Sequence, residues 1–471
     1  MFSMSRKNII LRLVQCLIMV FGLIQYLTLS AEVVIYSVPN EVRSGNKYIY
    51  RSKEYKVEIV QSDTYTPFVY SMDAMHKTNV SKTTAWVNFS FSGTIKVRVT
   101  KLYGNIGFCQ VLPASKDIKL FKESNTVEFN LSEAGHYSVE FQKGIVIDHP
   151  LLIFANPLEK DVPLATDPNV IRFDDGYHEI GEKYIVPKGK KIYISGGAYI
   201  KGQFYADKGH NISISGRGIL SGEDYPARTA DHMIVLRNAS KTLIEGITII
   251  HAPRYMIAVS GGSSQISNVK MLGWWFSTDG ISSGENSIIE HCFFKVNDDA
   301  VKVYSSNMIV RNNVIWQMEN GAPFMISWNG SRDFGNCHII NNDIIRVEHQ
   351  WDNENLAVVC AVHGGKAKIS GMVFENLRID NANWRVFHII TKPNRWGRWD
   401  PETGSISNFI FKNISFTGKQ KVKSLILGHD AFHPVADISF ENLVFGRKKI
   451  SNLEDVFIID KEFTKNIKLV K

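Results

Sequence analysis

Cysteine is scarce in this chain, and the common motifs for holding metals or phosphates are missing. Five cysteines occur in 471 residues, and the four after residue 30 match no zinc or disulfide spacing: Cys109, Cys292, Cys337 and Cys360. No glycine-rich loop opens a helix, no His/Cys cluster has metal-ligand spacing, and no Gly-x-Ser-x-Gly elbow is present. The sequence therefore indicates that the cysteines are buried free thiols, with a single disulfide between neighbouring coils as the alternative. It indicates no metal and no cofactor.

A strong charge of one sign is also missing. The formal net charge is +8, and it falls to +5 if residues 1–30 are removed, because that segment holds Arg6, Lys7 and Arg12 and no acid. A nucleic-acid-binding protein would need a concentrated basic face, so no nucleic-acid partner is expected. The mild positive charge leaves room for an anionic polysaccharide without requiring one.

Long apolar runs are confined to the N-terminus. Arg6 and Lys7 precede an apolar stretch that reaches Leu29, and small residues follow it, so cleavage is expected after Ser30 or Ala31. The uninterrupted run from Cys16 to Leu29 is too short to span a membrane. Residues 1–30 are therefore predicted to be a signal peptide, and the mature protein to be secreted or periplasmic without a membrane anchor.

Short apolar segments recur through the second part of the chain. They begin at Leu243, Ile266, Ile288, Ile309 and Ile339, in steps of 23, 22, 21 and 30 residues, and further copies follow from Val373, Ile410 and Ile438. Each is rich in β-branched and aromatic residues and is bounded by Gly, Asn or Ser, which is typical of strands. No helical stripe of useful length accompanies them. A strand repeat near 22 residues predicts a parallel β-helix that begins at about Val170.

The region before this repeat has a different pattern. From Glu32 to about Asn156, strands and turns alternate without the 22-residue period, as in a β-sandwich. A linker with several Pro and Asp residues follows it. The expected division is a signal peptide at 1–30, a β-sandwich at 31–165 and a β-helix at 166–471. Residues 381–403, with Trp384, Trp396 and Trp399, break the repeat and are predicted to be an inserted loop.

Three aspartates stand out within the repetitive region. Asp279 lies in Thr278-Asp279-Gly280, and Asp298 and Asp299 follow less than one repeat later. Asp is disfavoured in strands and is rarely buried without a partner. Adjacent coils lie about 4.8 Å apart, so these side chains can share a site. Glycosidases use a carboxylic acid and a carboxylate, which inverting enzymes hold roughly 6.5–9.5 Å apart. Neighbouring like charges should raise the pKa of at least one carboxyl.

Strand parity poses a difficulty for this site. Val301 and Val303 should face inward, which would place Asp298, Ala300, Lys302 and Tyr304 on the outside and bury Asp299. Both adjacent aspartates can reach one cleft only if the chain bends between residues 297 and 300. The structural alternative is an Asn/Asp cap between strands, tied to backbone amides.

The run from Trp274 to Trp328, WWFSTDGISSGENSIIEHCFFKVNDDAVKVYSSNMIVRNNVIWQMENGAPFMISW, resembles the catalytic segment of glycoside hydrolase family 49, the dextranases and isopullulanases. Family 28, the polygalacturonases, is similar more distantly. The resemblance implies a β-sandwich joined to a right-handed parallel β-helix. It implies that Asp298 is the general acid, that Asp279 and Asp299 hold the attacking water, and that Lys302, Tyr304 and Trp328 line the cleft. Asn320-Gly321-Ala322-Pro323 and Lys295 depart from the dextranase pattern and leave the dextran specificity in question.

Other residues are weaker candidates. Trp275, and also Trp274, can stack on a sugar ring. Possible subsites in later coils, for which ordinary packing is the competing interpretation, are His349, Trp351, His363, Arg395, Arg398, His429 and His433. The sequence thus predicts a monomeric, inverting, endo-acting hydrolase of a polysaccharide or oligosaccharide. The alternatives are a polygalacturonase-like or sulfated-galactan hydrolase, a non-catalytic glycan-binding β-helix, and a calcium-dependent polysaccharide lyase with a Lys or Arg base.

Overall fold

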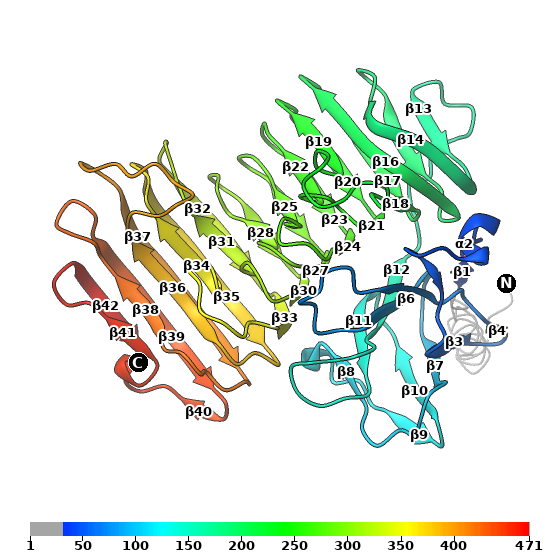
Figure 1. Ribbon diagram of the computed structural model, residues 1–471, viewed down its shortest axis with the longest axis horizontal. Helices are drawn as coiled ribbons and strands as arrows, with labels where there is room; N and C mark the ends of the chain where they lie inside the picture. Colours follow the sequence, from blue (N-terminus) through cyan, green and yellow to red (C-terminus); the bar gives the residue numbers. More distant parts are fainter. Residues whose placement is uncertain (1–31, 471) are drawn as a thin grey trace, which may run out of the picture.

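A computed structural model describes residues 32–470 of this chain. The signal peptide expected at residues 1–30 lies outside that range. The described residues form two small sheets within residues 33–157 and a sheet of 30 strands within residues 170–470 (Figure 1). The all-β prediction, a parallel β-helix preceded by N-terminal sheets, is confirmed. Within residues 32–470 no helix is long and apolar enough to cross a membrane.

The N-terminal part is a pair of sheets that share one core. Alternating residues of β3, β6, β7 and β10, among them Val57, Val87, Val97 and Phe129, are fully buried between the sheets. The seven-stranded sheet comprises β1 (Val33–Ile35), β2 (Tyr50–Arg51), β5 (Tyr70–Asp73), β6 (Thr83–Phe91), β8 (Gln110–Leu112), β11 (Gly135–Glu140) and β12 (Leu151–Pro157). The five-stranded sheet comprises β3 (Tyr55–Val60), β4 (Thr64–Tyr65), β7 (Ile95–Lys101), β9 (Phe121–Glu123) and β10 (Thr126–Leu131). Two short helical segments, α2 (Asn40–Ser44) and η1 (Ala114–Lys116), complete this part.

The second part is a solenoid in which the strands of each coil pair in parallel with their counterparts in the neighbouring coils, apart from a short antiparallel pair at residues 444–449. The strands form three series along the solenoid. The first contains β13 (Val170–Phe173), β15 (Lys191–Ile194), β17 (Ser213–Gly216), β20 (Leu243–Glu245), β23 (Gln265–Ser267), β26 (Ile288–Glu290), β29 (Ile309–Arg311) and β32 (Phe334–Ile340). The second contains β18 (Ile219–Ser221), β21 (Thr248–Ile250), β24 (Lys270–Leu272), β27 (Phe293–Val296), β30 (Val314–Gln317) and β33 (Asp343–Val347).

The third series carries the site described below. It contains β19 (Ile234–Arg237), β22 (Ile257–Val259), β25 (Ile281–Ser282), β28 (Val301–Lys302), β31 (Phe324–Ser327), β34 (Ala357–His363), β36 (Arg385–Thr391), β38 (Ser424–Leu427) and β41 (Phe457–Ile459). Long strands at the two ends of the solenoid are β14 (Gly176–Ile185), β16 (Ala198–Asp207), β35 (Lys368–Ile379), β37 (Ser405–Phe416), β39 (Val435–Phe445) and β42 (Thr464–Val470). Strand β40 (Lys448–Lys449) and η2 (Leu453–Asp455) close the C-terminal coil.

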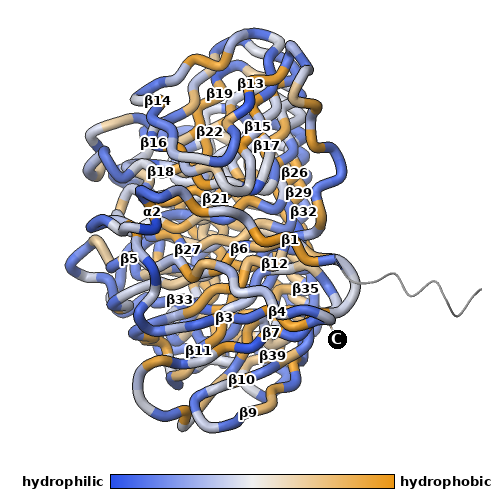
Figure 2. Tube along the Cα trace, turned by 90° about the vertical axis from the view of Figure 1, so that its right-hand side faces the viewer, coloured by the Kyte–Doolittle hydropathy of each residue, from blue (hydrophilic) through white to orange (hydrophobic). Residues whose placement is uncertain are grey.

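The core follows from strand alternation. Inward-facing residues such as Ile244, Ile266, Ile289 and Val310 are fully buried and stack from coil to coil. Figure 2 shows hydrophobic residues along the inside of the coils and hydrophilic ones on the outer loops. Each repeat segment predicted to begin between residues 243 and 339 contains one strand of the first series followed by one strand of the second series, as with β20 and β21.

Asparagines make the tight turns between the first and second series. Asn268, Asn312, Asn341 and Asn376 adopt φ between 52° and 57°, a left-handed conformation that Asn tolerates better than most residues. Their side chains also bond from coil to coil, as where Asn341 donates to Asn312 at 2.6 Å. These turns explain the Asn residues that bound each repeat in the sequence.

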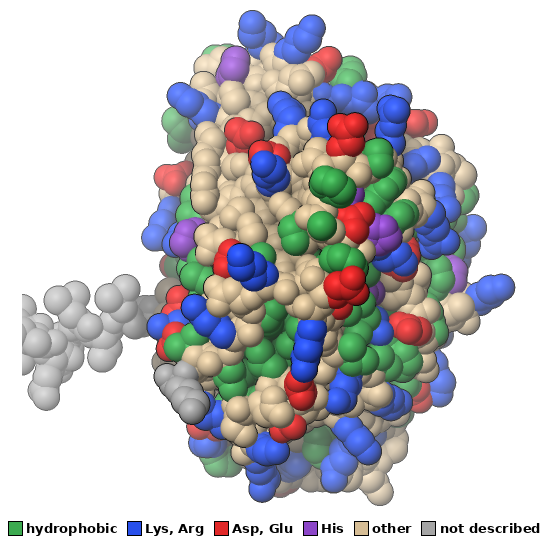
Figure 3. Space-filling view, turned by 90° about the vertical axis from the view of Figure 1, so that its left-hand side faces the viewer, with side chains coloured by type: hydrophobic (Ala, Val, Ile, Leu, Met, Phe, Trp, Pro, Cys, Tyr) green, Lys and Arg blue, Asp and Glu red, His purple; other side chains and the backbone are tan. Residues whose placement is uncertain are grey.

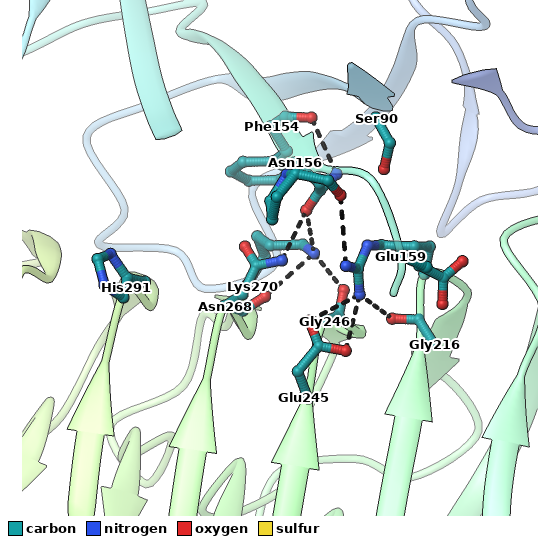
Figure 4. Close-up of polar contacts among 12 residues, drawn as sticks. Ser90, Phe154, Asn156, Glu159, Gly216, Glu245, Gly246, Asn268, Lys270 and His291 are labelled. Atoms are coloured by element: carbon teal, nitrogen blue, oxygen red, sulfur yellow. Dashed lines mark hydrogen bonds and ion pairs between the residues drawn. The ribbon is translucent and has the colours of Figure 1, made fainter. Parts of the chain in front are cut away.

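The N-terminal sheets pack against the second series of the solenoid, as Figure 1 shows. Phe154 and Trp86 share a buried cluster with Leu272, Phe293 and other residues of this series. A polar cluster lies in the same interface (Figure 4): Lys270 Nζ donates to Asn156 Oδ1 at 2.9 Å. Buried polar groups are tolerated only when they are hydrogen-bonded, so the two parts are joined by a specific contact as well as by apolar area.

The N-terminal part also reaches the solenoid turn that carries Asn320. Asn79 Nδ2 donates to Glu319 Oε1 at 3.1 Å, and the His76 ring lies 4.5 Å from that of Phe276. One sequence-based expectation fails nearby, because residues 381–403 are not a single inserted loop. Residues 385–391 form β36, which pairs in register with β34. The strand begins with a charged residue, Arg385, and for that reason the sequence did not indicate a strand at this position.

Candidate active site

A cleft of about 750 Å³ lies where the chain turns from the second strand series into the third. Asp279 and Asp299 occupy equivalent positions in consecutive coils. Each stands two residues before a third-series strand residue, Ile281 or Val301, and these two residues are paired. Their side chains therefore leave the coils in the same direction, one above the other.

Asp298 reaches the same cleft because the chain bends. Strand β27 ends at Val296 and β28 begins at Val301, and the intervening residues are not in a strand. Asn297 holds the bend: its Nδ2 donates to the Trp274 carbonyl at 2.7 Å, and its Oδ1 accepts from the Asn320 amide at 3.1 Å. The structure thus has the bend that the strand parity required.

Parity fails at one residue inside the bend. Ala300 was expected on the outer face, but it is fully buried with Val301 and Val303 in the solenoid core. The bend turns Ala300 inward, because the residues from 297 to 300 do not alternate as they would in a strand.

The three carboxylates converge around one lysine. One carboxylate oxygen from each of Asp279, Asp298 and Asp299 lies within 4.8 Å of the others. Lys302 Nζ lies 2.6 Å from Asp279 Oδ2 and 2.7 Å from Asp299 Oδ2. Both of these carboxylates are almost fully buried, whereas Asp298 is partly exposed.

The spacing differs from expectation. The carboxylate oxygens of the three aspartates lie closer together than the roughly 6.5–9.5 Å that separates the acid and base of inverting enzymes. Their spacing is nearer to the roughly 5–5.5 Å between the two carboxyl groups of retaining enzymes. Lys302 holds Asp279 and Asp299 together, and the bend from residue 297 to 300 brings Asp298 beside them.

Burial and these contacts give Asp279 and Asp298 different pKa values. Burial raises the pKa of Asp298 well above its usual range, and the nearby Asp279 and Asp299 charges raise it further. Burial also raises the pKa of Asp279, to about 7, although Lys302 opposes the rise. Burial disfavours the Lys302 charge, but the two carboxylates outweigh this and raise the pKa of its ammonium. Of the two carboxyls with a raised pKa, Asp298 is therefore the one that more readily keeps its proton.

Asp299 combines a structural contact with a place in the cleft. Its Oδ1 accepts from the Ala322 amide at 3.1 Å, while its Oδ2 faces Lys302. Gly321, just before Ala322, has φ 78°, and a Cβ there would lie 2.3 Å from the Asp298 carbonyl carbon. The glycine thus lets the next coil approach the two aspartates closely enough to hold Asp299.

Of the four residues expected to bind substrate, three line the cleft and one does not. Lys302, Tyr304 and Trp328 line the cleft. The Tyr304 hydroxyl is buried and has no hydrogen-bond partner within residues 32–470, so it can bond a substrate hydroxyl. Trp275 was expected in the cleft but is not among its lining residues. The centroid of its ring lies 5.9 Å from that of His76 in the N-terminal part, and the next residue, Phe276, lines the cleft instead.

The weaker candidates also divide. Trp351 and Arg395 line the cleft. His349 is fully buried and bonds the Gly321 carbonyl at 2.8 Å, so it supports the cleft from behind. Other candidates away from the cleft lining are Trp274, His363, Arg398, His429 and His433.

Sequence reasoning missed more than half of the cleft lining: Arg228, Arg254, Tyr255, Phe276, Ser277, Asn320, Asn329, Asn353, Asn355 and Trp396. Register would have identified some of them. Tyr255 stands two residues before Ile257, which pairs with Ile281, so it has the same coil position as Asp279. The third strand series was not identified in the sequence, and the coil positions could not be aligned without it.

The aspartates are also the one group within residues 32–470 whose spacing could hold a metal ion. Lys302 already supplies a cation to two of the three carboxylates. The donor set therefore fits an ammonium-balanced acid/base site better than a metal centre.

Comparison with known proteins agrees with the β-helix fold. A sequence profile described as a right-handed beta helix region matches residues 232–385. A dextranase of Arthrobacter sp. (strain CB-8) is 27% identical over 280 residues, covering 53% of this chain and 40% of the dextranase. An isopullulanase of Aspergillus niger is 24% identical over 427 residues, covering 74% and 75% of the two chains.

The structure of Dex49A from Penicillium minioluteum superposes with a TM-score of 0.71 at 20% identity, covering 92% of this chain and 96% of that one. This likeness shows a shared fold. The present chain matches only about two fifths of the length of the Arthrobacter dextranase. The resemblance to the dextranases and isopullulanases that the sequence indicated is confirmed.

Proposed function

We propose that this chain, which resembles the dextranases and isopullulanases of glycoside hydrolase family 49, is a secreted hydrolase that cleaves a polysaccharide with inversion. One observation carries the proposal. Three carboxyls converge in a cleft, and a single lysine pairs with two of them and leaves the third free. A glycan-binding protein has no need for such an arrangement, whereas hydrolysis needs an acid and a base facing one bond.

The roles follow from the contacts. Asp298 Oδ1 accepts from the Asp299 amide at 3.0 Å, which leaves Oδ2 to carry a proton. As the bond from the anomeric carbon to the glycosidic oxygen breaks, Asp298 gives this proton to the departing oxygen. A water held by Asp279 and Asp299 attacks the anomeric carbon and gives a proton to one of these carboxylates. That proton passes to solvent, and Asp298 takes up another, which restores the site.

Inversion is proposed because neither Asp279 nor Asp299 is well suited to be a nucleophile. Both oxygens of Asp299 are engaged, Oδ1 by the Ala322 amide and Oδ2 by Lys302, and Asp279 Oδ2 is bound to the same ammonium. Two carboxylates at equivalent positions of consecutive coils can instead hold one water between them. Since the short carboxyl spacing alone would favour retention, the anomeric form of the product is a stringent test.

The cleft also suits a chain-like substrate. Trp328, Trp351 and Trp396 line it, and the last two are 37% and 59% exposed. Large exposed aromatics in a cleft mark a binding surface, and rings of this kind can stack on sugar faces. These features support endo action on a polysaccharide, with dextran as the first substrate to test because of the dextranase likeness. We further propose that the protein acts as a monomer.

The test is reducing-sugar release from dextran, pullulan, polygalacturonate and carrageenans, with Asp298→Asn as the matched variant. The substitution keeps the shape of the side chain and removes its proton. Turnover should fall by about 10²–10⁴-fold on any glycan that the wild type cleaves, while substrate binding persists. If the variant keeps more than a tenth of the activity, Asp298 is not the acid. If the wild type releases sugar from no glycan, the hydrolase proposal fails and a binding role is favoured.

Export is tested separately. Expression of the full chain in a bacterium with a secretion pathway should yield a mature protein that begins at Ala31 or the next residue, by N-terminal sequencing. Recovery of the chain in the cytoplasm with residues 1–30 attached would contradict the proposed secretion.

A further inference from the structure

The charge of the cleft lining is unbalanced. Its only carboxyl groups are Asp279, Asp298 and Asp299, and it also contains Lys302 and three arginines: Arg228, Arg254 and Arg395. Within residues 32–470, none of the three guanidinium groups makes an ion pair. Their contacts are with backbone oxygens and one aromatic ring. Lys302 pairs with Asp279 and Asp299, and no described carboxylate of the cleft lies within ion-pair distance of the arginines.

Two of these arginines are held in place by the backbone. Arg254 Nε donates to the Ala230 carbonyl at 2.9 Å, and its Nη2 donates to the Arg228 carbonyl at 3.0 Å. Arg228 Nη2 approaches the Phe276 carbonyl at 3.4 Å. A guanidinium group has five N–H donors, so each arginine keeps several for a ligand. Such a fixed planar fork binds oxyanions in a bidentate manner with little further loss of side-chain entropy.

The third arginine is positioned by an aromatic ring. The Arg395 guanidinium lies 4.8 Å from the centroid of the Trp396 ring, and Trp396 is itself 6.5 Å from Trp328. A cation over an aromatic face is attracted to it and still offers its edge to solvent. This pair therefore places a positive charge beside a surface that can stack on a sugar.

The arginines lie on both sides of the aspartates along the solenoid. Arg254 precedes β22, one coil before Asp279, and Arg228 precedes β19, one coil earlier still. Arg395 follows β36, three coils beyond the strand after Asp298. Coils advance about 4.8 Å each. A glycan chain lying along the cleft would meet guanidinium groups on both sides of the bond to be broken.

We propose that the cleft takes an anionic glycan, whose carboxylate or sulfate groups pair with Arg228, Arg254 and Arg395 on either side of the cleavage point. The inference rests on the proposed function, since it concerns the substrate of the same cleft. An uncharged glucan would leave three cations unpaired in the cleft, whereas an anionic chain would neutralise them. The resemblance to dextranases concerns the acid/base residues and the fold, and these arginines are a separate feature.

Binding is measured with the full-length Asp298→Asn protein, which should hold a glycan without cleaving it. Dextran and dextran sulfate form a matched pair of probes, because they share one backbone and differ in charge. Polygalacturonate tests carboxylate in place of sulfate. Affinity is measured by calorimetry at two salt concentrations. At least one anionic probe should bind at least tenfold more tightly than dextran, and the difference should shrink at high salt.

Matched variants separate the cleft from general positive charge. Replacing Arg228, Arg254 and Arg395 with Gln should weaken anionic binding at least tenfold. The control replaces three exposed cations at the C-terminal end of the solenoid, Arg447, Lys449 and Lys468, where side chains of both charges are mixed (Figure 3). This control variant has the same net charge as the cleft variant. Its affinity for the anionic probes should stay within about twofold of that of the Asp298→Asn protein. Arg395→Gln alone, at an exposed residue, should show part of the loss if the triple variant folds poorly.

Several results would overturn the inference. These are equal binding of dextran and the anionic probes, equal losses in the cleft and control variants, or no effect of the arginines. The proposed function can fail on its own. Arginine-dependent anionic binding by a wild-type protein that cleaves no glycan would refute the hydrolase and keep the anionic cleft. Cleavage of dextran at a rate that the arginine variants do not change would keep the hydrolase and refute the anionic cleft.

Discussion

Replacing Lys302 with Met should destabilise the protein in a way that depends on pH. The ammonium lies 2.6 Å from Asp279 Oδ2 and 2.7 Å from Asp299 Oδ2, and all three side chains are at most 7% exposed. Removing one partner of a buried ion pair costs about 3–5 kcal/mol. That full loss is expected at pH 8, above the pKa of Asp279, which is about 7.

The loss should be smaller at acid pH. The pKa of Asp279 is about 7, so at pH 5 this carboxyl is protonated and no longer offers Lys302 a negative charge. The loss should then be about half as large, roughly 2 kcal/mol.

The sign follows from linkage. A carboxyl whose pKa is higher in the folded protein favours folding when protonated, and this contribution is lost as pH rises through the folded pKa. Without Lys302 the folded pKa of Asp279 moves above about 7. The variant therefore continues to lose stability where the wild type no longer does, and the gap should widen from pH 6 to pH 8.

The assay is urea unfolding of both proteins at pH 5, 6, 7 and 8. Lys412→Met is the control, since Lys412 makes an exposed pair with Glu441 at 3.6 Å on the same solenoid. That variant should lose less than about 1 kcal/mol at every pH. A Lys302→Met loss that is the same at pH 5 and pH 8, or no larger than that of the control, would refute the reasoning.

Two further substitutions test the shape of the cleft. Gly321→Ala should lower kcat more than tenfold, because the new Cβ would press on the backbone of Asp298, whereas Gly189→Ala, with a matching φ of 78° and no atom within 4 Å, should leave kcat unchanged. Trp328→Ala should raise KM about tenfold or more through a lost stacking surface. Trp275→Ala should lower the melting temperature and leave KM unaltered, and an increase in KM equal to that of Trp328→Ala would place Trp275 in the cleft.

The fold could be predicted because its signals are local. The spacing of apolar segments from Leu243 to Ile339 and the Asn residues at their turns indicate stacked strands without reference to distant residues. The prediction of an inserted loop at residues 381–403 was wrong because β36 begins at Arg385, a charged residue in a loop-like sequence. Only pairing with β34 makes these residues a strand, and pairing is not visible in one sequence.

The site could be predicted in part for the same reason. Asp279, Asp298 and Asp299 stand out because Asp is unusual among strands. The spacing of their carboxylates depends on Lys302, which lies between Asp279 and Asp299 only after the coils have stacked. Cleft residues from other coils, such as Arg254, depend on the register of the third series and carry no signal of their own.

The stereochemistry of the first product tests the central claim most directly. The account holds that water, placed by Asp279 and Asp299, attacks while Asp298 protonates the leaving oxygen. Proton NMR of the earliest cleavage product, taken before the anomers equilibrate, should therefore show the configuration opposite to that of the bond cleaved. The same configuration in the first product, or a glycosyl group trapped on Asp279 or Asp299, would contradict the account and make one of these carboxylates the nucleophile.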